Sequence, residues 1–233
     1  MLGVLGGMGP MATVDFMRKL TENTEAVRDQ DHLPVFIYSA THVPDRTAFI
    51  LGQEADPFPD LRAALALLEA AGADVIAIPC NTAHYWHAAL QAETRVRILH
   101  IVDGVAAELA RRGAEGETVA LLATDGTVKT GLYQNRLAAR GFSCIVPDPA
   151  HQEAVMRGIY LVKAGRMAEA EGVLQGEAEA LRRAGCRQIV MGCTEIPLAL
   201  EGSEADLRSS LVDATEALAR LAIEACRKRL ALR

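Results

Sequence analysis

The chain has 233 residues, of which 50% are hydrophobic and 23% charged, and its formal net charge is −6. This size and composition are typical of a globular protein with one large domain or two compact lobes. The sequence has no concentrated basic segment, which argues against a nucleic-acid partner, and no apolar run of the roughly 18 residues that a membrane span needs. The first residues also lack the basic stretch of a secretory signal, so we expect a cytoplasmic protein.

The predicted elements alternate short β-branched runs with longer segments of helical periodicity. In chain order, the predicted strands are Leu2–Leu5, Val35–Ser39, Val75–Ile78, Ile98–Ile101, Val119–Ala123, Ser143–Val146 and Gln188–Met191. Helices are expected between them, for example over Asp60–Ala71, where Leu61, Leu65 and Leu68 share one face. This alternation predicts an α/β fold with mostly parallel sheets.

The chain also resembles two copies of one plan. The strand and turn Leu5-Gly6-Gly7-Met8-Gly9 has a counterpart in Leu122-Ala123-Thr124-Asp125-Gly126, and the segment 76–82 has one in 189–195. We therefore predict two pseudo-symmetric lobes, residues 1–113 and 114–206, each a mostly parallel sheet flanked by helices. The active site is expected in the cleft between them. Residues 207–233 are expected to form a C-terminal helix, over about Leu207–Leu230, that packs on one of the lobes.

The five cysteines do not read as a disulfide framework, since their number is odd and none forms a C-x-x-C pair. Cys144, Cys186 and Cys226 have apolar neighbours and are interpreted as small buried residues. Cys80 and Cys193 differ, because each follows an apolar strand and precedes a polar pair. Ligands bind beyond the carboxyl ends of strands in open α/β sheets, and a helix start at that edge favours a thiolate.

Two such thiols from facing lobes could act on opposite sides of one small molecule. One, as thiolate, would remove a proton from an amino acid α-carbon, and the other would return a proton from the far side. Hydrogen-bond donors must then stabilise the carbanion through its carboxylate. Short polar side chains at the strand ends are suitable donors, namely those of Asn81, Thr82, Thr124 and Thr194.

Two other interpretations of the motifs are weaker. The segment 7–12 fits the dinucleotide pattern G-x-G-x-x-A, but the second strand has no Asp or Glu placed for a ribose. Its backbone near Met8 is better interpreted as a cradle for a substrate carboxylate. His84, His87 and His100 are too scattered to predict a metal site, and no metal or other cofactor is expected.

Three motifs resemble those of the aspartate/glutamate racemase family, and most closely its aspartate racemase branch. They are the segments 5–13 (LGGMGPMAT), 79–84 (PCNTAH) and 192–198 (GCTEIPL). The resemblance spans nearly the whole chain and implies a two-lobed fold without pyridoxal phosphate or metal, commonly a homodimer. Cys80 and Cys193 match the family's two catalytic bases, and Arg46 and Lys163 match positions that contact a substrate carboxylate. Glu195 stands where glutamate racemases typically have His, which favours the aspartate branch.

These observations predict a cofactor-independent racemase that interconverts L- and D-aspartate with two cysteines. A glutamate or broad-specificity amino acid racemase of the same fold is the nearest alternative. A dicarboxylate isomerase, a decarboxylase or a binding protein that senses a dicarboxylate are further alternatives. In each case the expected partner is a small acidic molecule.

Overall fold

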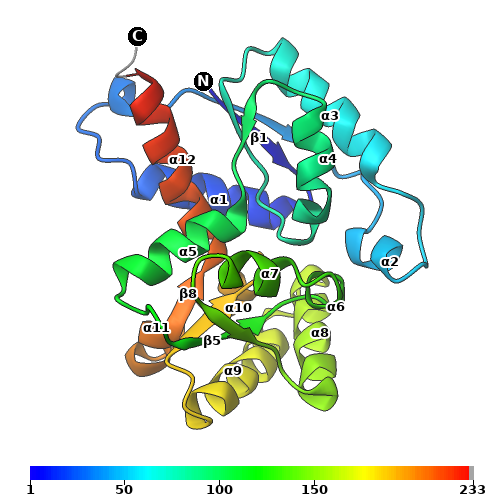
Figure 1. Ribbon diagram of the computed structural model, residues 1–233, viewed down its shortest axis with the longest axis vertical. Helices are drawn as coiled ribbons and strands as arrows, with labels where there is room; N and C mark the ends of the chain where they lie inside the picture. Colours follow the sequence, from blue (N-terminus) through cyan, green and yellow to red (C-terminus); the bar gives the residue numbers. More distant parts are fainter. Residues whose placement is uncertain (231–233) are drawn as a thin grey trace.

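The computed structural model describes residues 1–230 and has two α/β lobes (Figure 1). Each lobe contains one four-stranded sheet, and every strand pair is parallel. The first sheet has the order β2-β1-β3-β4 and consists of β1 (Leu2–Gly6), β2 (Val35–Ser39), β3 (Val75–Ala77) and β4 (Arg97–Ile98). The second has the order β6-β5-β7-β8 and consists of β5 (Thr118–Leu122), β6 (Ser143–Ile145), β7 (Gln188–Met191) and β8 (Leu211–Asp213).

The helices surround these sheets and connect them. Those up to the second sheet are α1 (Pro10–Glu22), α2 (Arg46–Ile50), α3 (Phe58–Ala70), α4 (His87–Ala92) and α5 (Ile101–Arg111), with two short 3-10 helices, η1 (Asp29–Asp31) and η2 (Thr82–Trp86). The later ones are α6 (Asp125–Lys129), α7 (Leu132–Ala138), α8 (Pro149–Lys163), α9 (Met167–Arg183), α10 (Ile196–Leu200), α11 (Ala205–Ser210) and α12 (Ala214–Leu230).

The equivalent strand orders confirm the predicted α/β class and the pseudo-symmetry of the two lobes. β1 and β5 are central in their sheets, and β3 and β7 lie beside them in the same relative place. Both β1 and β3 are buried at every position, as expected for parallel strands covered by helices on both faces. β3 and β7 are also the strands that lead to the two singled-out cysteines.

Two predicted elements are wrong in detail. The strand expected at Ile98–Ile101 ends at Ile98, because His100 caps α5 and its side chain accepts a hydrogen bond from the Val102 N–H. The helix expected over Leu207–Leu230 is interrupted by β8, whose residues pair with β7. The apolar run around Leu211 fits either a helix or a buried strand, and its tertiary pairing with β7 decides between the two.

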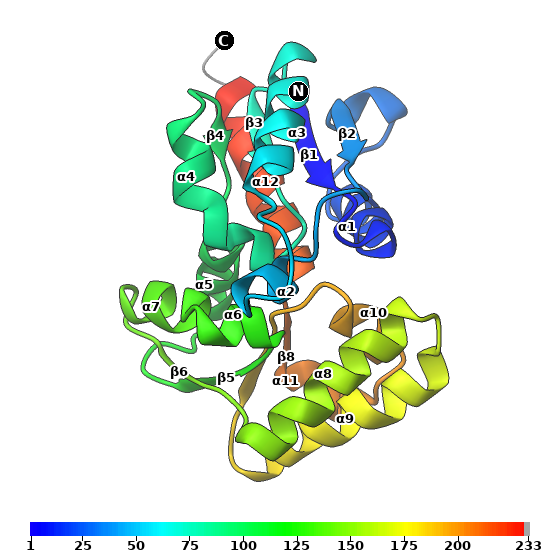
Figure 2. The same cartoon turned by 90° about the vertical axis from the view of Figure 1, so that its right-hand side faces the viewer.

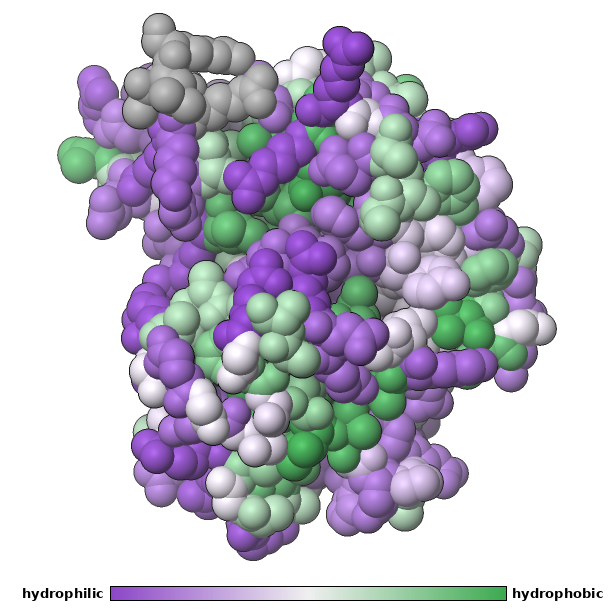
Figure 3. Space-filling view, viewed as in Figure 1, coloured by the Kyte–Doolittle hydropathy of each residue, from purple (hydrophilic) through white to green (hydrophobic). Residues whose placement is uncertain are grey.

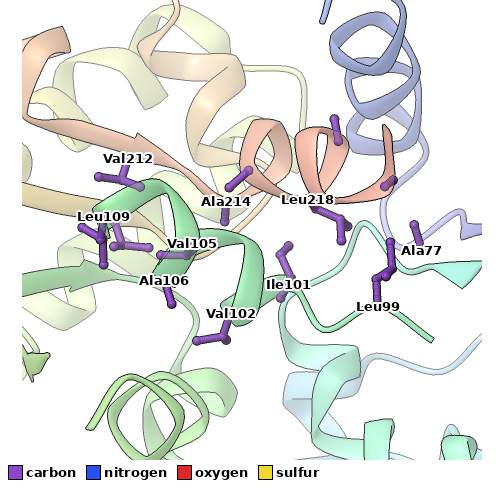
Figure 4. Close-up of a cluster of buried hydrophobic side chains, with 14 of the residues drawn as sticks. Ala77, Leu99, Ile101, Val102, Val105, Ala106, Leu109, Val212, Ala214 and Leu218 are labelled. Carbon is purple, nitrogen blue, oxygen red and sulfur yellow. The ribbon is translucent and has the colours of Figure 1, made fainter. Parts of the chain in front are cut away.

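Helices α5 and α12 connect the lobes, because each follows the sheet of one lobe and packs against elements of the other (Figure 2). α5 follows the first sheet but contacts α7 and β8, whereas α12 follows the second sheet but contacts α1 and β3. The two helices also pack on each other. Figure 4 shows side chains from α5, α12, β3 and β8 meeting in one apolar cluster, among them Val105, Leu218, Ala77 and Val212. The hydrophobic core is therefore continuous between the lobes.

The surface is mixed in character. In the view of Figure 3, hydrophilic residues alternate with scattered hydrophobic ones over both lobes. None of the helices within residues 1–230 combines the length and the apolar character needed to cross a lipid bilayer.

Candidate active site

A small cavity lies between the lobes, at the carboxyl ends of the central strands of both sheets. Its volume is about 20 Å³, enough for roughly one water molecule. All the residues singled out from the sequence line it. The complete lining is Met8, Asp45, Arg46, Thr47, Cys80, Asn81, Thr82, Thr124, Lys163, Cys193, Thr194 and Glu195.

The two cysteines reach this cavity from opposite lobes. Cys80 follows β3 of the first sheet and Cys193 follows β7 of the second, so they occupy equivalent places in the two halves of the fold. Each residue is only 5% exposed. Neither takes part in a disulfide bond. The arrangement presents two buried thiols to one small cavity.

The surroundings of Cys193 do not favour the thiolate form that the sequence predicts. Burial and the neighbouring Glu195 carboxylate raise the pKa of Cys193 well above its usual range, and Lys163 only partly offsets this effect. The Cys193 Sγ donates a hydrogen bond to Glu195 Oε2 at 3.0 Å. The expectation that a helix start lowers the pKa of Cys193 is therefore wrong, because desolvation and a like charge outweigh it. Burial and the hydrogen bond to Glu195 both favour the protonated thiol of Cys193.

The Cys80 turn is held by a buried histidine. His84 Nδ1 lies 2.9 Å from the Cys80 carbonyl oxygen, and the Ile101 N–H donates to His84 Nε2 at 3.1 Å. Since Nε2 accepts a hydrogen bond, the proton of the neutral ring is assigned to Nδ1, which donates to Cys80. Burial lowers the pKa of His84 to about 4 and keeps the ring neutral. His84 therefore connects the Cys80 turn to the start of α5.

A cluster of threonine hydroxyls joins the two lobes beside the cavity. Thr82 Oγ1 of the first lobe lies 2.9 Å from Thr124 Oγ1 and 3.0 Å from Thr127 Oγ1 of the second. Thr124 also accepts a hydrogen bond from the Thr127 N–H at 3.3 Å and caps α6. These contacts fix the positions of Thr82 and Thr124 relative to each other across the two lobes.

The two cations predicted for the site have different partners. Arg46 begins α2 and is 9% exposed, and its Nη1 donates to the carbonyl oxygens of Val43 and Pro44 at 3.2 and 3.0 Å. Among the described residues, its Nε has no hydrogen-bond partner and its guanidinium forms no ion pair with a carboxylate. Lys163, at the end of α8, lies 3.7 Å from Asp45 of the first lobe. Arg46 is thus a buried cation available to an incoming anion.

The electrostatics of Lys163 reflect its acidic neighbours. Burial lowers the pKa of Lys163, but Glu195, Cys193 and Asp45 together outweigh that effect, and the net result is a raised pKa. Lys163 is therefore a firmly protonated cation beside the thiol of Cys193. A positive charge at this position favours the thiolate form of Cys193 when its proton leaves.

Sequence reasoning missed four residues of this region: Asp45, Thr47, Thr127 and Tyr133. Asp45 accepts a hydrogen bond from the Ala48 N–H and caps α2, a short helix that is not among the predicted elements. The signal was present, since Pro44-Asp45 before a helical segment is a typical N-cap pattern. Thr47, Thr127 and Tyr133 carry no pattern of their own and are brought to the site only by the folded chain. Within the described residues, no group of three or more His, Cys, Asp or Glu side chains is arranged to hold a metal ion.

Similarity to known proteins agrees with this geometry. The chain is 32% identical to the aspartate racemase of Picrophilus torridus, with a TM-score of 0.84 over 96% of this chain and 93% of that one. It is 28% identical over 228 residues to the broad specificity amino-acid racemase RacX of Bacillus subtilis (strain 168), covering 94% of this chain and 95% of the relative. A glutamate racemase from Francisella tularensis, crystallised with D-glutamate, shares the fold at 13% identity and a TM-score of 0.68, covering 98% of this chain and 81% of that one.

The family profile described as Asp/Glu/Hydantoin racemase matches residues 5–222, nearly the whole chain. The fold, the duplicated strand order and the paired cysteine motifs agree with that match. The chain therefore belongs to the Asp/Glu/Hydantoin racemase family.

Proposed function

We propose that this protein is a cofactor-independent racemase that interconverts L- and D-aspartate, with Cys80 and Cys193 as its two proton-transferring groups. One observation carries the proposal: two buried thiols, from equivalent strand ends of opposite lobes, line the same cavity. Inversion at an α-carbon requires a proton to leave one face and another to arrive at the opposite face. A duplicated fold that supplies one thiol from each lobe suits this requirement.

The reaction needs one thiolate and one thiol at its start. The Cys193 Sγ donates a hydrogen bond to Glu195, so we assign the role of first acid to Cys193 and the role of first base to Cys80. Cys80 takes the α-proton, the carbon–hydrogen bond breaks, and its electron pair is delocalised into the α-carboxylate. Cys193 then donates its proton to the other face of the carbon. The finished turnover leaves Cys80 as thiol and Cys193 as thiolate, the form that accepts the opposite enantiomer.

An acidic substrate is supported by the charges around the thiols. Arg46 is buried without a carboxylate partner, an arrangement that is costly unless an anion binds it. The similarity to an aspartate racemase favours a four-carbon dicarboxylate. The small cavity must widen before such a substrate enters.

The first experiment is incubation of the purified protein with L-aspartate in heavy water, without added pyridoxal phosphate. Proton NMR and a chiral separation follow both enantiomers. We expect D-aspartate to appear carrying deuterium, while the remaining L-aspartate keeps its α-proton early in the reaction, because each thiol serves one face. Early exchange into both enantiomers would contradict the two-base mechanism, and no reaction at all would contradict the proposed function.

Cysteine variants test the two assignments. Cys80→Ala and Cys193→Ala should each lower racemisation by at least about 10³-fold, since each removes a proton-transfer group. Cys144→Ala is the matched control, because Cys144 is a partly buried cysteine that does not line the cavity. It should keep full activity. Full activity in either Cys80→Ala or Cys193→Ala would remove that cysteine from the mechanism.

A broader amino acid specificity is the second candidate, favoured by the similarity to RacX over almost the full length of both chains. The same assay with glutamate, alanine and larger neutral amino acids distinguishes the two. A kcat/KM for aspartate at least about tenfold above all others supports the first proposal. Comparable values across several side chains support the second.

A further inference from the structure

A buried tyrosine outside the cavity contacts one of the residues that line it. Tyr133 lies on α7 of the second lobe and is completely buried. Its hydroxyl donates a hydrogen bond to Oδ1 of Asn81, in the first lobe, at 2.6 Å. Asn81 directly follows Cys80 and is only 3% exposed. The hydrogen bond therefore joins the two lobes next to a cysteine of the cavity.

This hydrogen bond determines which way the Asn81 amide faces. An amide group has one end that accepts hydrogen bonds and one that donates them, and a half-turn about its last bond exchanges the two. Within the described residues, the Tyr133 hydroxyl has no other partner. If the amide turned over, the buried O–H of Tyr133 would lose its acceptor, which is unfavourable. The NH₂ end is therefore held away from Tyr133.

The NH₂ end of Asn81 has no partner of its own. Its Nδ2 atom is buried and makes no hydrogen bond to any described residue, although Asn81 lines the cavity. Buried donors are nearly always satisfied in folded proteins, so an unpartnered one beside a cavity indicates a missing ligand. The ligand that fits is an acceptor such as a carboxylate oxygen.

We propose that Tyr133 is a positioning residue, which holds the Asn81 amide so that its NH₂ group donates to a carboxylate oxygen of the substrate. The inference rests on the proposed racemase function and extends it to a residue that does not touch the substrate. The donor is most valuable as negative charge moves onto the carboxylate during proton removal. Because Tyr133 belongs to the other lobe, the donor is oriented only while the lobes are together.

A kinetic double-mutant cycle tests the inference. Tyr133→Phe should lower kcat/KM for aspartate about tenfold, less than the about 10²–10³-fold typical of losing a transition-state donor outright. In an Asn81→Ala background the same change should have no further effect, because no amide remains to orient. Tyr85→Phe, on a half-exposed ring, is the matched control and should stay within about twofold of wild type. Equal losses in both backgrounds would show that Tyr133 acts by packing alone and would overturn the inference.

A measurement without substrate separates this inference from the proposed function. In NMR spectra of the isotope-labelled protein, the Asn81 side-chain NH₂ should show no strong NOE to the ring protons of Tyr133, since Oδ1 faces the hydroxyl. A strong NOE would mean that the amide is turned over and would contradict the inference even in an active enzyme. If this NOE is absent, as expected, but the protein does not racemise aspartate, the proposed function is contradicted and the inferred orientation of the Asn81 amide is not.

Discussion

At the scale of single residues, the two cations of the cavity differ, because Lys163 has an acidic partner and Arg46 has none among the described residues. Lys163 forms an ion pair with Asp45 and lies in the field of Glu195, whereas the hydrogen bonds of the Arg46 guanidinium go only to backbone carbonyl oxygens among the described residues. A substrate with a second carboxylate can complete the environment of Arg46, and a substrate with a methyl side chain cannot. The specificity of the site should therefore depend on Arg46 more than on Lys163.

Arg46→Ala should lower kcat/KM for aspartate by at least about 30-fold, because truncating one partner of a buried charge pair typically costs about 2–5 kcal/mol. Activity towards alanine, which lacks the distal carboxylate, should change much less. Arg46→Lys keeps the charge and should recover part of the loss. The check is steady-state kinetics on both substrates, and equal losses for aspartate and alanine would remove Arg46 from recognition of the distal carboxylate.

The neutral form of His84 makes stability dependent on pH. Burial lowers its pKa to about 4, while the unfolded chain has an ordinary pKa near 6.5. As the pH falls from about 6.5 to 4, the unfolded state binds a proton that the folded state does not, so stability is present at neutral pH and is lost on acidification. The loss from His84 should reach about 3 kcal/mol.

Urea denaturation at pH 7 and at about pH 4.5 measures this effect. The free energy of unfolding should fall between the two pH values, and His84→Asn should show a smaller fall. His42→Asn, at an exposed histidine, is the control. A pH dependence that is identical in wild type and His84→Asn would disprove the role of His84.

At the scale of elements, α5 and α12 form the structural link between the lobes. Gly104 of α5 faces the backbone of α12 so closely that an added Cβ would lie 2.7 Å from the Ala217 carbonyl oxygen. A backbone atom cannot move aside as a flexible side chain can. This crossing therefore requires glycine for its missing side chain.

Gly104→Ala should destabilise the protein by about 1–3 kcal/mol, the usual cost of overpacking a core. Gly172→Ala is the matched control, since Gly172 lies on α9 with open space around it. Alanine there should stabilise the helix by about 0.5–1 kcal/mol through its better helix propensity. Thermal and urea unfolding of both variants provide the check, and an unchanged Gly104→Ala variant would mean that the crossing of α5 and α12 is looser than described.

At the scale of the whole molecule, a buried ionic group complements the apolar link. Lys19 of α1 donates to Asp15 on the same helix and to Asp213 at the end of β8, both at 2.5 Å. Lys19 and Asp15 belong to the first lobe and Asp213 to the second, and all three are largely buried. The lobes should therefore unfold together in a single transition.

Lys19→Met should destabilise the protein by about 3–5 kcal/mol, because it leaves Asp213 buried without its cation and Asp15 with Arg18 alone. Lys228→Met, which removes an exposed lysine paired with Glu224, should change stability by less than about 1 kcal/mol. Calorimetry measures both variants. Two separate transitions in the wild-type protein would contradict the cooperative link between the lobes.

The sequence alone determined the class of the fold and predicted the residues that line the cavity between the lobes. Parallel strands with buried, continuous apolar runs are recognisable locally, and so is a motif that repeats in both halves of the chain. Because the carboxyl ends of parallel strands lie at the same edge of a sheet, the strand pattern by itself places Cys80 and Cys193 at the edge where ligands bind in open α/β sheets. The resemblance of their motifs to a known family added Arg46, Lys163 and Glu195 to the predicted site.

The tertiary structure decided what depends on neighbours distant in the chain. The apolar run at Leu211 forms a strand because it pairs with β7, which no local pattern reveals. Helix α12 packs on the first lobe because its apolar face is buried against α1 and α5. Likewise, the pKa of a residue depends on which charges the fold brings near it. At Cys193, burial and Glu195 raise the pKa by more than the helix start lowers it. Propensity and motif act over a few residues, whereas burial, pairing and charge are properties of the folded whole.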